Sequence, residues 1–379
     1  MLPLETCCGC TACAMSCPKQ CIQMLPDQDG FIYPIIHTDS CIHCGKCERI
    51  CPVLNAKTTP EVPLQAFAAK NTDLECRRNS SSGGVFSVLA EYVLGCGGIV
   101  FGAAMTETLR VEHRPVTSLG ELASLRGSKY VSSDLGNSFA QVKTHLQTGH
   151  MVLFSGTPCQ VEGLLHYLGK PYDNLLTVDL ICHGVPSAKV WRVYISFLKN
   201  KHRSEIASVN FRSKDSGWKS FSMKVLFDSG QVYSAPMRTD PYLHAFLDNL
   251  CLRPSCHNCK FKFAPRHSDF TLADFWGIQK LSPKTDDDSG TSLVFANTEA
   301  ANELLGILKE KLWIEKTDSD FAIAHNSAMV KSVEPHHFRQ YFFRRLGKLR
   351  FDLLVKNCFS PSYTVRLHRQ IIKLIYRRN

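Results

Sequence analysis

Cysteine is the residue type that dominates the chemistry available to this sequence. The chain of 379 residues holds 18 cysteines, and ten of them fall within the first 51 residues. Two quartets share the spacing C-x2-C-x2-C-x3-C-P: Cys7, Cys10, Cys13 and Cys17, and Cys41, Cys44, Cys47 and Cys51. Thiolates at this spacing wrap a short loop around an iron-sulfur cubane. The two quartets therefore predict two [4Fe-4S] clusters.

The fourth cysteine of each quartet is expected to cross to the cluster of the other quartet. The predicted ligand sets are Cys7, Cys10, Cys13 and Cys51, and Cys41, Cys44, Cys47 and Cys17. Pairs of CxxC motifs also form zinc sites, but two identical quartets that both end in Cys-Pro favour iron-sulfur cubanes. We therefore predict that residues 1–56 form a bacterial-type 2[4Fe-4S] ferredoxin domain, with Cys8 and Cys21 as packing residues.

A second set of cysteines lies in the middle of the chain. Cys159 and Cys182 each follow a predicted buried strand, so both should lie at the carboxyl edge of a sheet, where α/β folds place their sites. The segment CLRPSCHNCKF adds Cys256 and Cys259, and also Cys251. One hypothesis is a third [4Fe-4S] cluster held by Cys159, Cys182, Cys256 and Cys259. The spacing leaves three alternatives open: buried structural cysteines, a structural zinc site, and a nucleophilic Cys159 at a helix N-terminus.

Two short segments of small and basic residues could bind a phosphate or a flavin. NSSSGG places Ser82, Gly83 and Gly84 just ahead of a predicted helix, where exposed N–H groups and the positive helix end attract anions. LRGSKYVSS adds Arg126 and Lys129 as cations for a pyrophosphate. By themselves these segments are equally consistent with a helix cap and a solvated loop.

The rest of the sequence predicts an α/β domain with a mixed sheet. After a polar, proline-containing linker at residues 56–63, apolar strand-like runs alternate with helical patterns as far as residue 199. The predicted strands are 65–70, 97–105, 151–156 and 174–184, and the predicted helices are 84–94, 135–146, 160–168 and 187–199. Beyond Ile206 the pattern changes to β-hairpins, with SVNFRS, SFSMKVLF and QVYSAP joined by Asp-Ser-Gly turns.

The C-terminal part is strongly basic from Pro335 onward, and VRLHRQIIKLIYRR alternates apolar and cationic residues at helical spacing. We expect a basic helical tail packed on the core, with docking onto an anionic membrane surface or an acidic partner as the alternative. The predicted fold class is α+β / α/β. Its three parts are the ferredoxin domain at 1–56, a larger mixed-sheet α/β domain at 64–325 and the basic helical tail at 326–379.

Bulk composition narrows the classes of protein. Cysteines in short regular spacings, without a signal peptide, indicate a reducing cytoplasm rather than a secreted disulfide framework. No apolar run is long enough for a transmembrane helix. The formal charge is +10, but three oxidised clusters with their thiolates, at about −2 each, would lower it to about +4. Because no recognised nucleic-acid motif is present, we expect no nucleic-acid partner.

Six ordered segments resemble the family of beta subunits of coenzyme F420 hydrogenases and dehydrogenases, here with a fused N-terminal double-cluster ferredoxin. They are NSSSGGVFS, RGSKYV, SGTPCQVEGLLHYLGK, NLLTVDLICHGVPS, CLRPSCHNCKF and SDFTLADFWGI. The resemblance implies an FAD-containing α/β domain that carries a [4Fe-4S] cluster beside the flavin. It implies Cys159, Cys182, Cys256 and Cys259 as the ligands of that cluster, and Ser82, Gly83, Gly84, Gly127, Ser128 and Lys129 as the flavin region.

This resemblance predicts an FAD-dependent iron-sulfur oxidoreductase in which electrons enter at the ferredoxin clusters, cross the domain cluster and reach the flavin. The expected partner is a redox protein or a soluble two-electron carrier. The fused ferredoxin and the basic tail resemble bacterial family members encoded among surface-polysaccharide genes. Two alternatives are an electron-relay or adaptor subunit without catalysis of its own, and a scaffold in a polysaccharide assembly complex. No residue is predicted to be catalytic.

Overall fold

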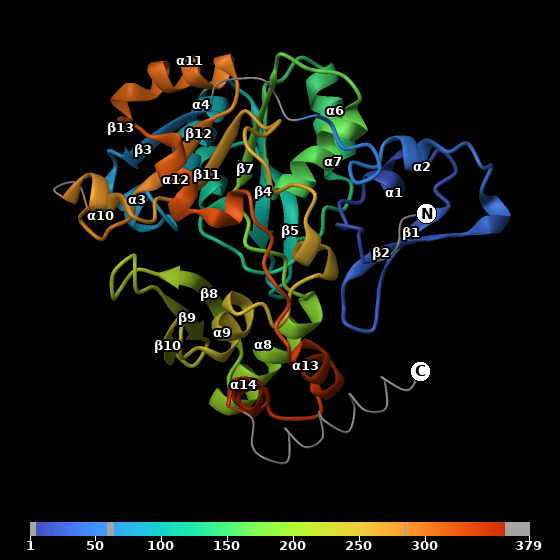
Figure 1. Cartoon of the computed structure of the whole chain (residues 1–379), viewed down its shortest axis with the longest axis vertical. Helices are drawn as coiled ribbons and strands as arrows, with labels where there is room; N and C mark the ends of the chain where they lie inside the picture. Colours follow the sequence, from blue (N-terminus) through green and yellow to red (C-terminus); the bar gives the residue numbers. More distant parts are fainter. Residues whose placement is uncertain (1–4, 59–63, 284–285, 361–379) are drawn as a thin grey trace.

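The computed structural model describes residues 5–58, 64–283 and 286–360, which form three parts (Figure 1). A small N-terminal module, blue in Figure 1, lies beside helices α6 (Ser138–Gln147) and α7 (Pro158–Leu168) of a larger domain. The larger domain contains an eight-stranded sheet, and a lobe built on a three-stranded sheet lies beyond one end of it. The predicted ferredoxin-like module followed by a mixed-sheet α/β domain is confirmed.

The N-terminal module repeats one pattern twice. Helix α1 (Ala12–Ser16) begins after Thr11, whose φ is 62°, and helix α2 (Lys46–Arg49) begins after Gly45, whose φ is 67°. This left-handed residue turns the chain tightly between the cysteine loop and the helix in both repeats. Strands β1 (Ile22–Pro26) and β2 (Ile32–Ile36) pair antiparallel between the repeats.

The eight-stranded sheet has the order β13-β3-β12-β11-β7-β6-β4-β5. Its strands are β3 (Gln65–Asn71), β4 (Ile99–Met105), β5 (Val111–Val116), β6 (Val152–Gly156), β7 (Leu175–Leu180), β11 (Phe270–Asp274), β12 (Ser292–Ala296) and β13 (Leu312–Thr317). Strands β4, β6, β7 and β11 are parallel, and the other neighbours pair antiparallel. The carboxyl ends of the parallel strands therefore meet at one edge, as predicted for the positions before Cys159 and Cys182.

Helices cover both faces of this sheet. On β4, Val100 packs with α4 (Val85–Gly95) and α11 (Glu299–Ile307), whereas its neighbours Ile99 and Phe101 pack with α6 and α7 on the opposite face. This alternation is the side-chain period of a strand that is buried on both sides. The remaining helices of this domain are α3 (Leu74–Arg78), α5 (Leu119–Leu122), α10 (Ile278–Leu281) and α12 (Ser319–His325).

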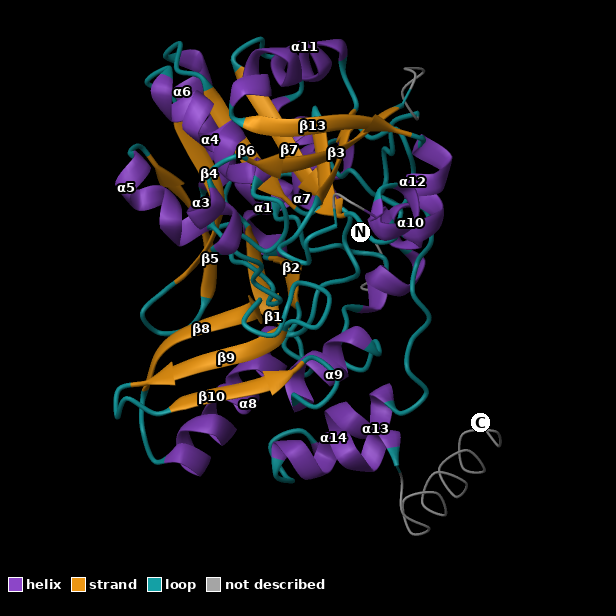
Figure 2. Ribbon diagram, turned by 90° about the vertical axis from the view of Figure 1, so that its left-hand side faces the viewer, coloured by secondary structure: helices purple, strands orange, loops and turns teal. Residues whose placement is uncertain are grey.

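The lobe joins segments that are distant in sequence. Its sheet, in the order β10-β9-β8, contains β8 (Ile206–Ser213), β9 (Ser222–Phe227) and β10 (Val232–Pro236), all antiparallel (Figure 2). Helices α8 (Ala188–His202), α9 (Pro241–Leu247), α13 (Arg339–Arg345) and α14 (Phe351–Phe359) pack in the same core. Short 3-10 turns complete the chain: η1 (Thr38–Ser40), η2 (Ala123–Leu125), η3 (Pro254–Asn258), η5 (Leu308–Glu310) and η6 (Ser327–Met329).

Two predicted elements differ from the structure by three residues or more at one end. The helix expected at 135–146 begins at Ser138, because Gly136 has a positive φ of 48° and donates its N–H to the Asp134 carboxylate in a turn. The strand expected at 174–184 ends at Leu180, and the chain then turns toward Cys182. In the predicted tail, α13 and α14 are helical as expected, whereas VRLHRQIIKLIYRR lies outside the described residues.

Candidate iron-sulfur and flavin sites

The cysteine loop ahead of α1 brings thiols of both quartets together. Burial raises the pKa of the Cys13 thiol to about 12, and the neighbouring Cys7 and Cys51 thiols contribute to this shift. Burial also raises the pKa of the Cys51 thiol, with a contribution from Cys7. Cys51 belongs to the second quartet but lies beside the first, which is the arrangement that crossed ligation requires.

The first three cysteines of the second quartet line a small cavity near the surface. Cys17 of the first quartet lines this cavity together with Cys41, Cys44 and Cys47, and the Cys44 side chain is exposed. Cys21 also lines it, and the Cys21 Sγ lies 3.3 Å from the Cys17 Sγ. The structure thus gathers the four predicted ligands of the second cluster around one space, with a fifth thiol beside them.

The four cysteines proposed to bind the third cluster come from three separate segments of the chain. Cys159 is the second residue of α7, which starts with a capping box between Thr157 and Gln160, and the Thr157 Oγ1 lies 3.2 Å from the Cys159 Sγ. Cys182 follows β7, Cys256 lies in η3, and Cys259 is the first residue after η3. Both Cys159 and Cys182 therefore lie at the carboxyl edge of the sheet.

These four thiols lie near enough to one another to shift each other's pKa. Burial raises the pKa of Cys256, and the thiols of Cys182, Cys159 and Cys259 raise it further. Burial likewise raises the pKa of Cys182 to about 12, whereas the cations of Lys262 and Arg266 act in the opposite direction. The Lys262 ammonium also donates a hydrogen bond to the Cys182 carbonyl.

This donor set fits a [4Fe-4S] cubane. Four sulfur atoms converge, and two cations beside them oppose the negative charge that a thiolate-bound cluster carries. In the described ranges no three His, Cys, Asp or Glu side chains converge closely enough to hold a single metal ion. A cubane requires a wider arrangement, because each of its four thiolates binds a different iron atom.

The other cysteines stay outside these groups. Cys251 is fully buried in the core of the lobe, and its burial raises the pKa of its thiol to about 12. Cys76 and Cys358 are also buried, whereas Cys96 is exposed. Cys8 differs from all of these, since its thiol contacts Cys10 and Cys159.

The structure places the two predicted flavin segments side by side. The Ser128 N–H and hydroxyl both donate to the Ser81 Oγ, at 2.6 and 2.8 Å. The Gly83 N–H donates to the Ser292 Oγ at 2.9 Å, and the Asn71 N–H donates to the Gly83 carbonyl at 2.7 Å. The Ser82-Gly83-Gly84 turn is therefore fixed to the sheet, and the Gly127-Ser128-Lys129 segment is fixed to the turn.

Lys129 points into its own loop. Its ammonium donates to the carbonyls of Ser124 and Arg126 at 3.0 and 2.8 Å, and burial lowers its pKa to about 7. A second link continues from this loop to the cysteines, because the Gln160 side-chain amide donates to the Ser133 Oγ at 2.9 Å. Residues 126–133 thus connect the Ser81 turn with the start of α7.

Strand β8 and the residue after it contribute two cations that the sequence did not single out. Lys214 donates from its ammonium to the carbonyls of Ser82 and Arg77, at 2.8 and 2.9 Å. Arg212 is buried and pairs through Nη1 with the Asp274 carboxylate, but its Nε and Nη2 have no hydrogen-bond partner in the described part of the chain. Such unmatched buried N–H groups suit an anionic ligand. The only sequence signal was the presence of Arg and Lys in a hairpin strand.

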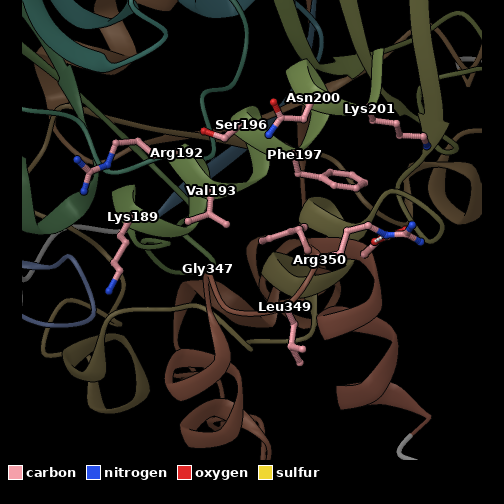
Figure 3. A pocket seen from close by; sticks show the side chains of 12 residues that line it. Lys189, Arg192, Val193, Ser196, Phe197, Asn200, Lys201, Gly347, Leu349 and Arg350 are labelled. Atoms are coloured by element: carbon pink, nitrogen blue, oxygen red, sulfur yellow. Dashed lines mark hydrogen bonds and ion pairs between the residues drawn. The ribbon is translucent and has the colours of Figure 1, made fainter. Parts of the chain in front are cut away.

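A groove lies in the lobe, away from these cysteines. It measures about 920 Å³ and lies between α8 and the residues around α14 (Figure 3). Cations line much of it, with apolar side chains between them. The lining residues include Lys189, Arg192, Phe197, Lys201, Leu349 and Arg350. Asp352, which pairs with Arg350, also lines this groove.

Over the described residues, no helix combines the length and the apolar character needed to cross a membrane.

Known proteins resemble this chain in both of its parts. One subunit of the F(420)H(2) dehydrogenase of Methanosarcina mazei is 24% identical over 327 residues, which cover 82% of this chain and 84% of that protein. A ferredoxin of Mycolicibacterium smegmatis is 35% identical over 74 residues, or 19% of this chain and 65% of the ferredoxin. A chain from a solved structure of the F420-reducing [NiFe] hydrogenase complex of Methanosarcina barkeri aligns with a TM-score of 0.46 and 17% identity, over 72% of this chain and 92% of that chain.

Family models divide the chain in the same way. The model of the 4Fe-4S dicluster domain matches residues 6–55, which contain both cysteine quartets. Two models of the coenzyme F420 hydrogenase/dehydrogenase beta subunit match residues 66–139 (N-terminal part) and residues 149–320 (C-terminal part). Together the beta-subunit models span about two thirds of the chain. The chain therefore belongs to the family of coenzyme F420 hydrogenase/dehydrogenase beta subunits, and it is an iron-sulfur electron-transfer protein with an N-terminal 4Fe-4S dicluster domain.

Proposed function

We propose that this chain is an FAD-dependent iron-sulfur oxidoreductase that relays electrons between its ferredoxin-type clusters and a two-electron carrier or substrate. The observation that carries the proposal is the convergence of Cys159, Cys182, Cys256 and Cys259 at the carboxyl edge of the sheet. The thiol of Cys8 joins this group to the N-terminal module, and residues 126–133 join it to the Ser81 turn. Electron carriers bound in the N-terminal module, at the four domain cysteines and at the Ser81 turn would therefore lie one after another along a connected path through the protein.

The residues of the chain then have separate tasks. When bound, the cubanes supply one-electron steps and the flavin supplies the exchange between one-electron and two-electron chemistry. The twelve cysteines named as ligands fix the iron atoms. Ser82, Gly83, Gly84, Gly127, Ser128 and Lys129 form the proposed flavin region. We add Arg212 to this region, since its buried Nε and Nη2 groups could hold a flavin phosphate or ring oxygen.

The geometry of the N-terminal module gives a direction to the path. The cavity of the second quartet includes the exposed Cys44, so an external electron donor can approach this cluster. Cys10 of the first quartet is buried in the same core as α6 and α7, so the first cluster lies on the side of the larger domain. We therefore propose that electrons enter at the second quartet and leave through the first.

The partner is proposed from charge and from relatives. The relative from M. mazei is named as a subunit of F420H2 dehydrogenase, so a redox partner protein or a soluble carrier such as F420 is the first candidate. A place in a surface-polysaccharide pathway is a further proposal, based on the resemblance to bacterial family members. The cations of the lobe groove suit an anionic partner surface. The basic C-terminal sequence favours a second form of this proposal, peripheral contact with an anionic membrane surface in the cytoplasm.

One observation favours the alternative, an electron-relay or adaptor subunit without catalysis. The ammonium of Lys129, the basic residue of the proposed flavin region, is already engaged by two carbonyls of its own loop. Flavin content separates the two functions. A chain that holds its clusters but releases no FAD after anaerobic reconstitution is a relay.

Iron analysis of the reconstituted full chain tests the third cluster. We expect about 12 iron atoms per chain for three cubanes and about 8 iron atoms in Cys159→Ala, which would keep only the ferredoxin pair. Cys96→Ala, at an exposed position outside all three groups, is the matched control and should keep the wild-type iron content. A wild-type chain with about 8 iron atoms, or zinc in place of iron, would contradict the proposal.

A further inference from the structure

We propose that Cys8 and Arg253 form the junction through which the N-terminal module passes electrons into the larger domain, with Cys8 as the bridging thiol and Arg253 as a positioning residue. This inference rests on the proposed third cluster. Neither residue belongs to a cysteine quartet or to the four domain ligands.

Cys8 touches one predicted ligand of each neighbouring cluster. Its thiol lies beside the thiol of Cys10, from the first quartet, and beside the thiol of Cys159, from the domain group. A thiol is a weak donor that can serve one sulfur acceptor at a time. Once both neighbours are iron-bound thiolates, the Cys8 S–H can donate to either of them, and such hydrogen bonds tune a cluster.

Helix α7 explains why Cys8 reaches both neighbours. Cys159 and Gly163 are four residues apart and therefore lie on the same face of α7. A Cβ atom added at Gly163 would lie 2.8 Å from the Cys10 Cβ and 3.1 Å from the Cys10 Sγ. Only a glycine allows this approach, so the loop of the first quartet rests directly on the helix face that carries Cys159.

Arg253 also holds this loop. It is 3% exposed, and its guanidinium donates from Nε to the Cys7 carbonyl at 2.8 Å and from Nη2 to the Ile32 carbonyl at 2.6 Å. Its own carbonyl accepts the Cys256 N–H at 3.0 Å. One residue therefore connects the first cysteine loop, the hairpin of the module and the loop that carries Cys256.

The charge of Arg253 is directed at the junction. Its guanidinium lies 4.3 Å from the Tyr33 ring centre, and no carboxylate pairs with it in the described ranges. An added Cβ at Gly9 would lie 2.7 Å from its Nη1, so the cysteine loop closes over the guanidinium. A buried cation beside both sites would stabilise the reduced state of the clusters bound there. With clusters bound at the first quartet and at the domain cysteines, Cys8 and Arg253 would flank a one-electron transfer in which the first cluster is oxidised and the second reduced, with no bond or proton change.

Cys8→Ala tests the bridge in the full holoprotein. We expect wild-type iron content, a weaker magnetic interaction between the reduced first-quartet and domain clusters in electron paramagnetic resonance, and a several-fold slower reduction of the domain cluster in single-turnover mixing. Cys21→Ala is the matched control, because the thiol of Cys21 lies beside the thiols of Cys17 and Cys41, which are predicted ligands of one and the same cluster. Wild-type coupling and rate in Cys8→Ala, or a loss of iron from it, would overturn the bridging role.

Arg253→Met tests the positioning residue, with Arg253→Lys as the conservative variant. We expect the midpoint potentials of the first-quartet and domain clusters to fall in Arg253→Met, to recover partly in Arg253→Lys, and the second-quartet cluster to stay unchanged. Arg339→Met is the control, since Arg339 also contacts this region but has Asp29 as a partner at 3.8 Å. Equal shifts in all clusters, or none, would refute the role of Arg253. If the wild-type chain holds no third cluster, the proposed function fails first.

Discussion

Burial changes the pKa of individual titratable side chains near the carboxyl edge of the sheet. His113 on β5 is an example outside the cysteine groups. Its ring stacks on Phe154 at 5.4 Å, and its Nε2 lies 3.0 Å from the Ser155 carbonyl oxygen. Burial lowers the pKa of His113 from 6.5 to about 4, so the folded chain holds this ring neutral at neutral pH.

This shift predicts a pH dependence of stability. Between pH 6.5 and about 4 the unfolded chain binds a proton at His113 that the folded chain does not, so stability falls as the pH falls through this window. In His113→Gln this contribution is absent. The stability gap between wild type and variant should therefore narrow by about 1 kcal/mol between about pH 7.5 and about pH 5.5, measured by anaerobic urea unfolding.

His150→Gln is the control for this measurement, because His150 is exposed. Its profile should run parallel to that of the wild type. A gap for His113→Gln that stays constant over the same pH range would show that the folded chain protonates His113 as readily as the unfolded chain does.

At the scale of elements, short turns fix the proposed flavin region to the sheet. The Ser82-Gly83-Gly84 turn lies against β3 and β12, and a Cβ atom at Gly83 would lie 2.4 Å from the Ala69 carbonyl oxygen and 2.7 Å from the Ser292 nitrogen. Both neighbours are backbone atoms of paired strands, so they cannot move aside easily. Gly84 has a φ of 85° instead, which strains any residue with a side chain.

Alanine substitutions in this turn should separate the two effects. We expect Gly83→Ala to destabilise the chain by about 1–3 kcal/mol through overpacking, and Gly84→Ala by about 1 kcal/mol through backbone strain. Gly83→Ala should also lower the amount of flavin retained after reconstitution, because the turn must shift. Thermal unfolding and flavin release measure the two outcomes.

Gly120→Ala is the control for the turn, since Gly120 lies in α5 and an added Cβ would meet nothing within 4 Å. Helix propensity predicts that it is neutral or slightly stabilising. If Gly83→Ala were as stable as Gly120→Ala, the close packing of the turn on the sheet would be incorrect.

At the scale of the whole molecule, the C-terminal helices are part of the lobe rather than an appendage to it. Phe342 of α13 and Leu354 of α14 are fully buried, in one core with Trp191 of α8 and Tyr242 of α9. The chain thus returns after residue 325 to complete a lobe that began at α8. The domain boundary predicted at residue 326 stays a prediction, but the packing argues against an independent unit there.

Two truncations test this packing and the proposed membrane contact together. A chain that ends at His337 loses several buried side chains, each worth about 1.5–3 kcal/mol, so it should aggregate. A chain that ends at Ser360 keeps this core and should fold. If the basic C-terminal sequence contacts a membrane, the Ser360 truncation should sediment less with anionic vesicles than the full chain does.

The full-length variant Arg192→Glu with Lys201→Glu examines the groove in the same vesicle assay. It should lower sedimentation with anionic vesicles while leaving neutral vesicles unaffected, since both side chains are exposed cations of the groove. Equal sedimentation of all three chains would leave a redox protein or a soluble carrier as the partner.

The spacing of cysteines and the pattern of apolar residues along the chain were enough to predict the N-terminal module and much of the larger domain. Two identical quartets predicted a ferredoxin module, since cubane ligation depends on spacing within one loop. Alternating apolar runs predicted the strands around Cys159 and Cys182, and parallel pairing then placed both cysteines at one edge. The family resemblance, confirmed by the matching models, named Cys256 and Cys259 as their companions.

Only the tertiary structure decided what meets across these segments. Cys8 packs against the core that it shares with α6 and α7, as expected. Its position beside both Cys10 and Cys159 was not predicted, because contacts between a loop and a distant helix leave no periodic trace in sequence. Arg253 and Arg212 are charged residues whose burial depends on partners more than 60 positions away. Spacing therefore determined which atoms can bind iron, whereas the packing of module, sheet and lobe determined which of those sites face each other.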